Sequence, residues 1–344
     1  MIYDYAFVKK PNINTIAKEA GVSRTTVSRV INESGYVNYK TKLKVREVIQ
    51  KYGYIPSNMA RNLSKGKSDI IGIVIPEIEN PFFGEILKVI SQKTEENGLS
   101  IICFNSNNDP EEDVKALATM RNYRVNGLVY TPAIDYQGDA QQRQISSLLD
   151  RLDAPVVILD RRLDFYKKAD GVYFDNAGAS YQATKSLIEA GHKKIAIINA
   201  ELDRVLARER QAGYLAALKK YGIPLREDYI FLGDYSIEKS YAFSRNCLSL
   251  EDRPTAVLTC NNFTSLGFLK ALSETNLTLN RDITCVGFDR LNELEMMGIV
   301  FNYIERNTEE MGRKTIEYLM QRLTFPDRPY IDHIIKVKLV LRSL

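Results

Sequence analysis

The chain has 344 residues, of which 44% are hydrophobic and 26% are charged, so it is long enough for two or three domains with cores of their own. No apolar run approaches the about 20 residues of a membrane span, and the amino-terminal segment lacks an apolar stretch followed by a small-residue cleavage site, which argues against a membrane protein and against secretion. The formal net charge is +4, but it is unevenly distributed: residues 1–68 hold 13 basic and 4 acidic side chains, and residues 69–344 hold 34 basic and 39 acidic ones. The positive charge of the amino-terminal part favours a nucleic-acid partner for it.

The first predicted elements are two short helices joined by a glycine turn. The first helix is predicted from apolar residues at i, i+3, i+4 and i+7, namely Ile13, Ile16, Ala17 and Ala20. Asn12 stands where its N-cap belongs, Gly21 supplies the turn, and Ser23 is placed to cap the second helix. The apolar side of the second helix is formed by Val27, Val30 and Ile31. This pattern is typical of a helix-turn-helix.

The opposite face of the second helix is polar and basic. Its side chains are Arg24, Thr25, Ser28 and Arg29. Arginine can donate to the O6 and N7 atoms of guanine as a fork, threonine can contact a thymine methyl group or a phosphate, and serine adds a phosphate donor. These residues therefore suit the major groove of DNA. A solvated face of a small helical bundle is the alternative, which the concentration of positive charge in residues 1–68 disfavours.

A third helix is predicted to close the small core. Its apolar residues follow helical spacing at Val45, Val48, Ile49 and Tyr52. Lys42 and Arg46 lie on its outer face.

From Ile70 onward the chain alternates short β-branched runs with helical segments. Strands are predicted at Ile70–Ile75, Ser100–Phe104, Gly127–Tyr130, Val156–Asp160, Lys194–Asn199, Thr255–Cys260 and Ile283–Phe288, and a strand-like run covers Ile334–Leu341. Continuous apolar strands separated by helices indicate a parallel sheet covered on both faces. The number of strands exceeds one comfortable open sheet. The predicted fold is thus a small all-α head followed by an α/β core of two Rossmann-like parallel-sheet subdomains.

Polar or aromatic groups follow several of these strands. They are Asn80–Phe83, Asp160–Arg161, Asn261–Asn262 and Asp289–Arg290. Because ligands in such sheets bind beyond the carboxyl ends of the strands, these side chains are expected to meet in one cleft. For any one of them a turn or a helix cap is the plainer explanation. Four at equivalent places favour a ligand site.

The remaining chemistry is sparse. Cys103, Cys247, Cys260 and Cys285 are widely spaced, form no metal-ligand pair, and are expected to be buried free thiols. The two histidines, His192 and His333, are expected to be structural. No catalytic motif or glycine-rich phosphate loop is present, so we expect no catalytic residues, no cofactor and no metal, and not an enzyme.

The sequence resembles the lactose/galactose repressor family of bacterial transcription regulators, whose core is periplasmic-binding-protein-like. The resemblance rests on Ala-Gly-Val-Ser-Arg-Thr-Thr-Val-Ser-Arg-Val-Ile-Asn at 20–32, Met-Ala-Arg-Asn-Leu at 59–63, Asn-Pro-Phe-Phe at 80–83, Phe-Asp-Asn at 174–176, Gly-His-Lys-Lys-Ile-Ala at 191–196 and Arg-Pro-Thr-Ala-Val at 253–257. It covers nearly the whole chain. It implies a DNA-binding regulator, expected to be a cytoplasmic repressor of a carbohydrate-utilisation operon.

The resemblance also implies roles for individual residues. Operator DNA would be contacted by Ser23, Arg24, Thr25, Thr26, Ser28, Arg29, Asn32, Ala60 and Leu63. Leu63 matches a leucine that family members wedge into the minor groove from a hinge helix, which kinks the duplex. The effector would be contacted by Phe82, Phe83, Asp160, Arg204, Arg210, Tyr235, Asn261 and Asp289. This set resembles a sugar site, and it leaves a phosphorylated sugar or a carboxylate open.

Three departures from the family pattern stand out. About ten residues precede the first helix beyond the usual start. Thr15 stands where many family members have an acid, so a weaker cap of the first helix is expected. Asn262 also replaces an acid that is common at its position in the family. The chain stops soon after the last strand-like run, which leaves no room for the heptad tail of tetrameric relatives. A homodimer on a pseudo-palindromic operator is expected.

The domain plan expected from all this has three parts. A helix-turn-helix domain would cover 1–57, a hinge helix and linker 58–68, and an effector-binding core 69–344. Within the core, an amino-terminal subdomain would hold about 69–161 and 291–324, and a carboxyl-terminal subdomain about 162–290 and 325–344. Effector binding between them would change operator affinity, by induction or by corepression. The alternatives are a core that senses a partner protein or a purine-type corepressor, and a sugar-binding protein without a DNA function.

Overall fold

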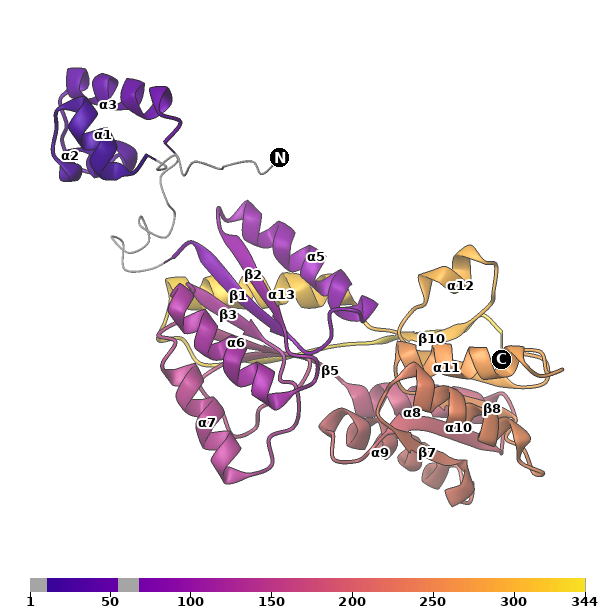
Figure 1. Ribbon diagram of the computed structural model, residues 1–344. Helices are drawn as coiled ribbons and strands as arrows, with labels where there is room; N and C mark the ends of the chain where they lie inside the picture. Colours follow the sequence, from indigo (N-terminus) through magenta and orange to yellow (C-terminus); the bar gives the residue numbers. More distant parts are fainter. Residues whose placement is uncertain (1–10, 55–67, 344) are drawn as a thin grey trace, which may run out of the picture. The chain divides into compact units, whose positions relative to one another are not determined.

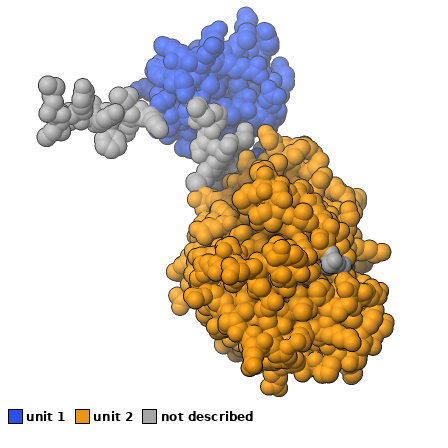
Figure 2. All heavy atoms as spheres, turned by 90° about the vertical axis from the view of Figure 1, so that its right-hand side faces the viewer, with its two compact units in different colours: residues 1–69 blue, residues 70–344 orange. Residues whose placement is uncertain are grey.

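The computed structural model describes residues 11–54 and 68–343. The chain divides into two compact units, residues 1–69 and residues 70–344, which Figure 2 shows in different colours. The first unit is helical, and the second contains both sheets.

Three helices form the first unit: α1 (Ile13–Ala20), α2 (Arg24–Ile31) and α3 (Tyr39–Lys51). Gly21 ends α1 in the left-handed conformation, at φ 64°, which glycine adopts without a steric penalty. The buried side chains are among those that helical periodicity predicted: Ile16, Ala17, Ala20, Val27, Val30 and Val45.

The cap of α1 is complete, contrary to the expectation of a weak one. The Asn12 side chain accepts hydrogen bonds from the backbone N–H groups of Asn14 and Thr15, at 3.0 and 3.1 Å. The Thr15 hydroxyl in turn accepts from the Asn12 N–H at 3.4 Å. A threonine at the third helical position thus takes the part that an acid plays in the usual capping box.

The first sheet of the second unit is parallel throughout and has the strand order β11-β5-β4-β3-β1-β2. Its strands are β1 (Ile70–Ile75), β2 (Ser100–Asn105), β3 (Gly127–Tyr130), β4 (Val156–Leu159), β5 (Asp170–Phe174) and β11 (Asp332–Ile335). Helices α5 (Pro81–Glu96) and α13 (Thr308–Thr324) cover one face, and α6 (Pro110–Tyr123) and α7 (Asp139–Asp150) cover the other (Figure 1). We call this assembly the amino-terminal subdomain.

The second sheet has the order β12-β10-β9-β8-β6-β7, and only β12 runs antiparallel to its neighbour. Its strands are β6 (Ile195–Ala200), β7 (Ile230–Gly233), β8 (Ala256–Thr259), β9 (Thr284–Phe288), β10 (Asn302–Glu305) and β12 (Lys338–Val340). Helices α8 (Asn176–Glu189) and α9 (Val205–Lys220) cover one face, and α10 (Ile237–Ser249) and α11 (Asn262–Ser273) the other. The short α12 (Asn292–Met296) and a 3-10 turn (Glu227–Tyr229) complete this carboxyl-terminal subdomain.

The chain crosses between the subdomains three times: between β5 and α8, between β10 and α13, and between β11 and β12. The expected subdomain boundaries therefore need correction. Residues 162–174 end in β5 of the first sheet, residues 302–305 form β10 of the second, and 332–335 return to the first. The sequence did not reveal this, because which sheet a short strand joins depends on partners that are distant in the chain.

Local patterns also missed some strands. β5, β7 and β10 are short and were not predicted, and the single run expected over Ile334–Leu341 is two strands in different sheets. Cys247, Cys260 and Cys285 are buried free thiols as expected, but Cys103 is exposed because β2 is the edge strand of its sheet. Within the described residues no helix is both long and apolar enough to cross a membrane.

Candidate functional site

The recognition face of α2 is exposed and begins at its capped end. The Ser23 hydroxyl accepts from the Thr26 N–H at 3.1 Å and shares a 2.9 Å hydrogen bond with the Thr26 hydroxyl. Ser23 and Thr26 thus hold the helix start, where unpaired N–H groups favour a phosphate. Arg24, Thr25 and Arg29 are exposed, opposite the buried Val27 and Val30.

The end of α2 carries the other predicted polar residues. The Asn32 amide donates to the Ser28 hydroxyl at 3.2 Å, and both side chains are partly buried. Ser28 and Asn32 therefore support each other along the helix. Arg24 and Arg29 form no ion pair within the described residues, so their guanidinium groups are not already committed to a carboxylate. Ala60 and Leu63, the predicted minor-groove contacts, lie outside the described residues.

Two exposed tyrosines beside α3 were not predicted. Tyr36 is 90% exposed and Tyr39, the first residue of α3, is 73% exposed. Both belong to a unit whose net charge is strongly positive. An exposed aromatic next to a basic helix is a candidate contact to the DNA backbone, and the signal in the sequence was the position of both tyrosines shortly before Lys40 and Lys42.

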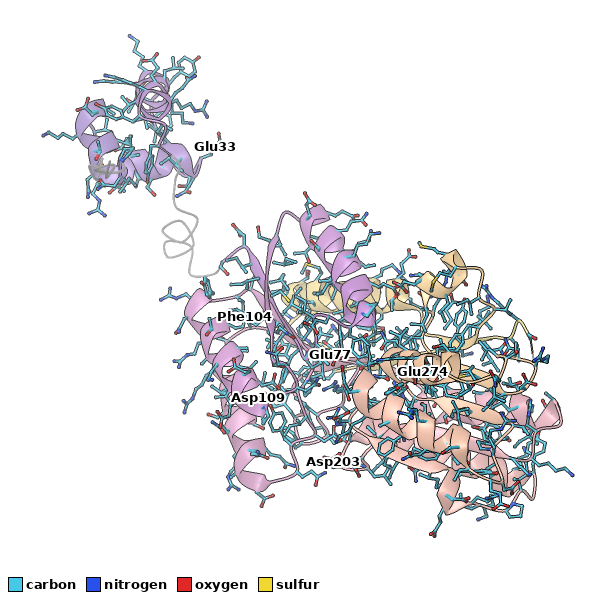
Figure 3. The ribbon with its side chains drawn as sticks, turned by 45° about the vertical axis from the view of Figure 1, so that its right-hand side comes forward. Glu33, Glu77, Phe104, Asp109, Asp203 and Glu274 are labelled. Carbon is cyan, nitrogen blue, oxygen red and sulfur yellow. The ribbon has the colours of Figure 1, made fainter. Side chains whose placement is uncertain are left out.

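Seven of the eight predicted effector residues line one small cavity between the subdomains, of about 40 Å³, which we call the effector cavity. They are Phe82, Phe83, Asp160, Arg204, Arg210, Tyr235 and Asn261. The same cavity is lined by Glu77, which Figure 3 labels, and by Asn80, Asn108, Arg161, Leu206, Asp234 and Arg306. Three of the four strand ends that were predicted to meet therefore contribute to this cavity, whereas Asp289 and Arg290 line the neighbouring hollow.

The backbone at three of these strand ends is left-handed. Asp160 has φ 62°, Tyr235 φ 70° and Asp289 φ 74°. Such angles are uncommon for residues other than glycine and are found where the surroundings impose them, often at functional sites. They turn the chain out of the strand, so that Asp160 and Tyr235 line the cavity and Asp289 reaches Arg306.

Asp289, the eighth predicted residue, binds a side chain that the sequence did not single out. Both of its carboxylate oxygens accept from Arg306, at 2.6 and 2.7 Å, and Asp160 accepts from the same guanidinium at 3.2 Å. The guanidinium also lies 3.6 Å from the centre of the Phe82 ring. Arg306 thus joins an acid of each subdomain.

Arg306 follows β10 at the crossing into α13, which explains why it was missed. Had β10 been recognised, the strand-end rule would have included it. Burial lowers the pKa of the Arg306 guanidinium, but the charges and hydrogen bonds of Asp289 and Asp160 outweigh this, so that its pKa is raised. Arg306 therefore stays charged in a buried place. With Asp289 and Phe82 it also lines a larger hollow of about 550 Å³ beside the crossings.

Arg210 is held firmly inside the carboxyl-terminal subdomain. It is 2% exposed and donates to the Asn176 side chain at 3.0 and 2.9 Å and to the Cys260 carbonyl. Its guanidinium also lies 4.2 Å from the centre of the Phe288 ring. The arginine expected to grip a ligand is thus preorganised by the protein.

Tyr235 lies beside this arginine. Its hydroxyl donates to Asn199 at 2.8 Å, and burial raises its pKa to about 12, so it remains a neutral aromatic. Asn261 caps α11 by accepting from the Thr264 N–H at 2.7 Å, while its amide donates to the Tyr235 carbonyl at 3.3 Å. The cap explanation is therefore correct for Asn261, which lines the cavity as well.

Direct contacts hold the subdomains together around the cavity. The Asn262 amide donates to Asn80 at 2.8 Å, and the Gln137 amide donates to the carbonyl of Asp203, which Figure 3 labels, at 3.0 Å. The Asp135 carboxylate accepts from the Val205 N–H, the first N–H of α9. α9 has no side-chain cap of its own, so a carboxylate of the amino-terminal subdomain serves as one.

The histidines have the structural surroundings that were expected. His192 Nδ1 is 2.8 Å from the Thr255 hydroxyl, and His333 Nδ1 is 3.1 Å from the Tyr318 hydroxyl. In the part of the chain that the structure describes, no group of three or more histidine, cysteine, aspartate or glutamate side chains is arranged to hold a metal.

A helix-turn-helix unit joined to a two-sheet core with a cavity between its subdomains defines a ligand-responsive DNA-binding protein. Comparison with known families agrees. Residues 12–57 match the bacterial regulatory proteins of the lacI family, and residues 68–340 match the periplasmic binding proteins and sugar binding domain of the LacI family. The chain belongs to the LacI family, and it is a DNA-binding transcriptional repressor.

Individual relatives cover almost the whole chain. The HTH-type transcriptional repressor PurR of Mannheimia succiniciproducens is 31% identical over 331 residues, which is 96% of this chain and 97% of that protein. A solved transcriptional regulator CelR–cellobiose complex is 26% identical, with a TM-score of 0.71 over 97% of this chain and 99% of that one. The Lac repressor dimer bound to operator and an anti-inducer, 24% identical with a TM-score of 0.82 over the same shares, shows the same fold.

Proposed function

We propose that this repressor controls a carbohydrate-utilisation operon and that its effector, a sugar or sugar derivative, binds in the effector cavity. The observation that carries the proposal is the convergence of seven predicted residues from both subdomains on that one cavity. Arginine, amide and aromatic groups around a small space suit a ligand with several hydroxyl groups. Relatives solved with cellobiose and with ribose support a sugar.

Regulation would act through the closure of the subdomains. The contacts between Asp135 and Val205 and between Asn262 and Asn80 join the subdomains beside the cavity. An effector that binds there would change the spacing of the subdomains by altering these contacts. The change would be transmitted through the hinge expected over 58–68, most of which lies outside the described residues. It would alter operator affinity by about 5- to 150-fold.

A purine corepressor is the second candidate. The PurR repressors that are 31% identical to this chain favour it, and so do the aromatic side chains of Phe82, Phe83 and Tyr235, which offer flat faces to a planar base. An inducer and a corepressor differ in the sign of the effect on operator binding.

The test is a screen of sugars, sugar derivatives and purines for their effect on the affinity for the DNA upstream of the chain's own transcription unit. We expect one compound class to change the Kd by about 5-fold or more. The Tyr235→Ala variant should lose most of this change, because the centre of the ring lies 5.8 Å from the guanidinium groups of Arg204 and Arg210, which also line the cavity. Tyr221→Ala, at an exposed tyrosine after α9, is the control and should keep it. A full response in Tyr235→Ala would contradict the proposal.

We also propose that the repressor is a homodimer. Apolar side chains around α12 are exposed, among them Met296 at 86%, Met297 at 65% and Val300 at 46%. A patch of this kind is typical of an interface, and two helix-turn-helix units would match a two-fold operator. Sedimentation velocity at micromolar concentration should give twice the mass of 39.2 kDa. Met296→Glu with Met297→Glu should shift it toward the monomer, and an unchanged dimer in this variant would place the interface elsewhere.

The protein is proposed to work in the cytoplasm without catalysing a reaction. The support is its membership of a family of transcriptional regulators and the structural surroundings of both histidines. No cofactor is required for the mechanism.

A further inference from the structure

Four arginines line the effector cavity: Arg161, Arg204, Arg210 and Arg306. Three acids line it with them, namely Glu77, Asp160 and Asp234. The pairing of these charges decides what kind of ligand the cavity accepts.

The acids of the site are already engaged. Asp160 and Asp289 share Arg306, and both oxygens of Asp289 are used. Asp234 lies 3.4 Å from Lys239 and accepts from the Ser236 hydroxyl at 2.6 Å. Glu77 accepts from the Asn80 amide at 2.9 Å. Each of these acids therefore already accepts a hydrogen bond from a donor of the protein, which reduces what it offers to a neutral sugar.

The other three arginines have different partners. Arg161 donates to the carbonyls of Pro132 and Ala133, at 3.0 and 2.6 Å, and to Asn108 at 2.9 Å. Arg204 lies against the Tyr235 ring. Neither of them, nor Arg210, forms an ion pair with a carboxylate of the described residues.

Two further observations concern the surroundings of these arginines. Burial lowers the pKa of the Arg161 guanidinium; the negative charge of Asp160 opposes this effect, and the positive charge of the neighbouring Arg204 adds to it. The Glu209 carboxylate reaches Arg210 only through Asn176, whose amide donates to it at 3.0 Å. Arg210 uses three of its five N–H groups on protein oxygens, which leaves donors for a ligand.

We propose that the effector carries an anionic group, a phosphate or a carboxylate, that binds between Arg161, Arg204 and Arg210. This inference rests on the proposed function. Guanidinium groups bind such oxyanions through paired, charge-assisted hydrogen bonds, which are stronger than those to neutral hydroxyls. Arg306 contributes to specificity in the same site, because its positive charge is shared by Asp160 and Asp289 and so reduces the repulsion that these acids would exert on an anion.

Calorimetric titration of the full-length protein tests this with matched ligands. Glucose is compared with glucose 6-phosphate and glucuronate, and ribose with ribose 5-phosphate, with inorganic phosphate as a further probe. We expect an anionic compound to bind about 10-fold or more tightly than its neutral parent, as charge-assisted hydrogen bonds predict. The phosphate and carboxylate arms distinguish the two sources of charge.

The Arg204→Gln variant should lose this preference, because Arg204 is the cavity arginine least involved in holding the fold. Lys220→Gln, which makes the same charge change at the exposed far end of α9, should retain it. Equal or tighter binding of the neutral parent, a preference that survives in Arg204→Gln, or no binding by any anionic compound would overturn the inference. A neutral sugar or a purine that alters operator affinity would overturn it while leaving the proposed function standing.

Discussion

Replacing Arg29 by alanine is expected to weaken operator binding by about 30-fold or more and to leave the Tm nearly unchanged. Arg29 is exposed on α2 and forms no ion pair within the described residues. An arginine contact to a base or a phosphate contributes about 1–3 kcal/mol, and a dimer would lose it twice. Because the side chain does not contribute to the buried core of the unit, thermal unfolding should change little.

Fluorescence anisotropy with an operator fragment measures the weaker binding, and a salt titration assigns it. If Arg29 binds a phosphate, the slope of log Kd against log salt falls by about 0.9 for each phosphate that the variant no longer neutralises, whereas a base contact leaves the slope nearly unchanged. Lys115→Ala is the control, since it removes one exposed positive charge from α6, outside the basic unit. Operator binding at full strength, or a Tm several degrees lower, would show that Arg29 is not a DNA contact of the kind proposed.

The second large effect is expected at Arg306. Arg306→Gln removes the shared partner of two buried acids, Asp160 and Asp289, whose side chains are 3% and 10% exposed. Removing one member of a buried ion pair leaves an uncompensated charge and costs about 3–5 kcal/mol. For a core of this size the Tm should fall by about 5 to 9 °C, which differential scanning calorimetry measures.

A double-mutant cycle shows whether the destabilisation comes from the pair. Asp289→Asn combined with Arg306→Gln should destabilise less than the sum of the two single changes, by about 1 kcal/mol or more, because the second change removes the charge that the first one stranded. Arg290→Gln is the matched control: its ion pair with Glu295 lies at the surface, with the Arg290 side chain 46% exposed, and should contribute at most about 1 kcal/mol. Additive effects, or equal destabilisation in Arg306→Gln and Arg290→Gln, would show that the network does not hold the subdomains.

The helical head was predictable in detail. Ile16, Ala17 and Ala20 become its core because their spacing puts them on one side of α1, whatever else the chain does. The Asn12 cap and the Gly21 turn are equally local, since each depends on residues within a few positions. The cap at Thr15 was predicted to be weak, because a capping box usually has an acid at the third helical position. The prediction was wrong because the threonine hydroxyl can also accept the hydrogen bond from the Asn12 N–H.

The effector cavity was predictable as a meeting of strand ends but not as a set of partners. Parallel sheets bring their carboxyl ends together, so Asp160 and Asn261 were found in this way, whereas Tyr235 was found only through the resemblance to the family. Arg306 was missed because its strand, β10, is four residues long and gives little periodicity. Its pairing with Asp160 joins positions 146 residues apart, which no local pattern encodes.

The amino-acid sequence alone determined the helix-turn-helix, the basic amino-terminal unit, the alternation of strands and helices, and most of the side chains at the cavity. The helices, the charge distribution and the strand ends follow from residue chemistry and from spacing over a few turns or strands, whereas Arg204, Arg210 and Tyr235 were found through the resemblance to the family. The tertiary structure decided which sheet β5, β10 and β11 join, where the chain crosses between subdomains, and which acids pair with Arg306. Those outcomes depend on strand pairing and buried charge pairing between distant residues, whose free energy exists only once the core has formed.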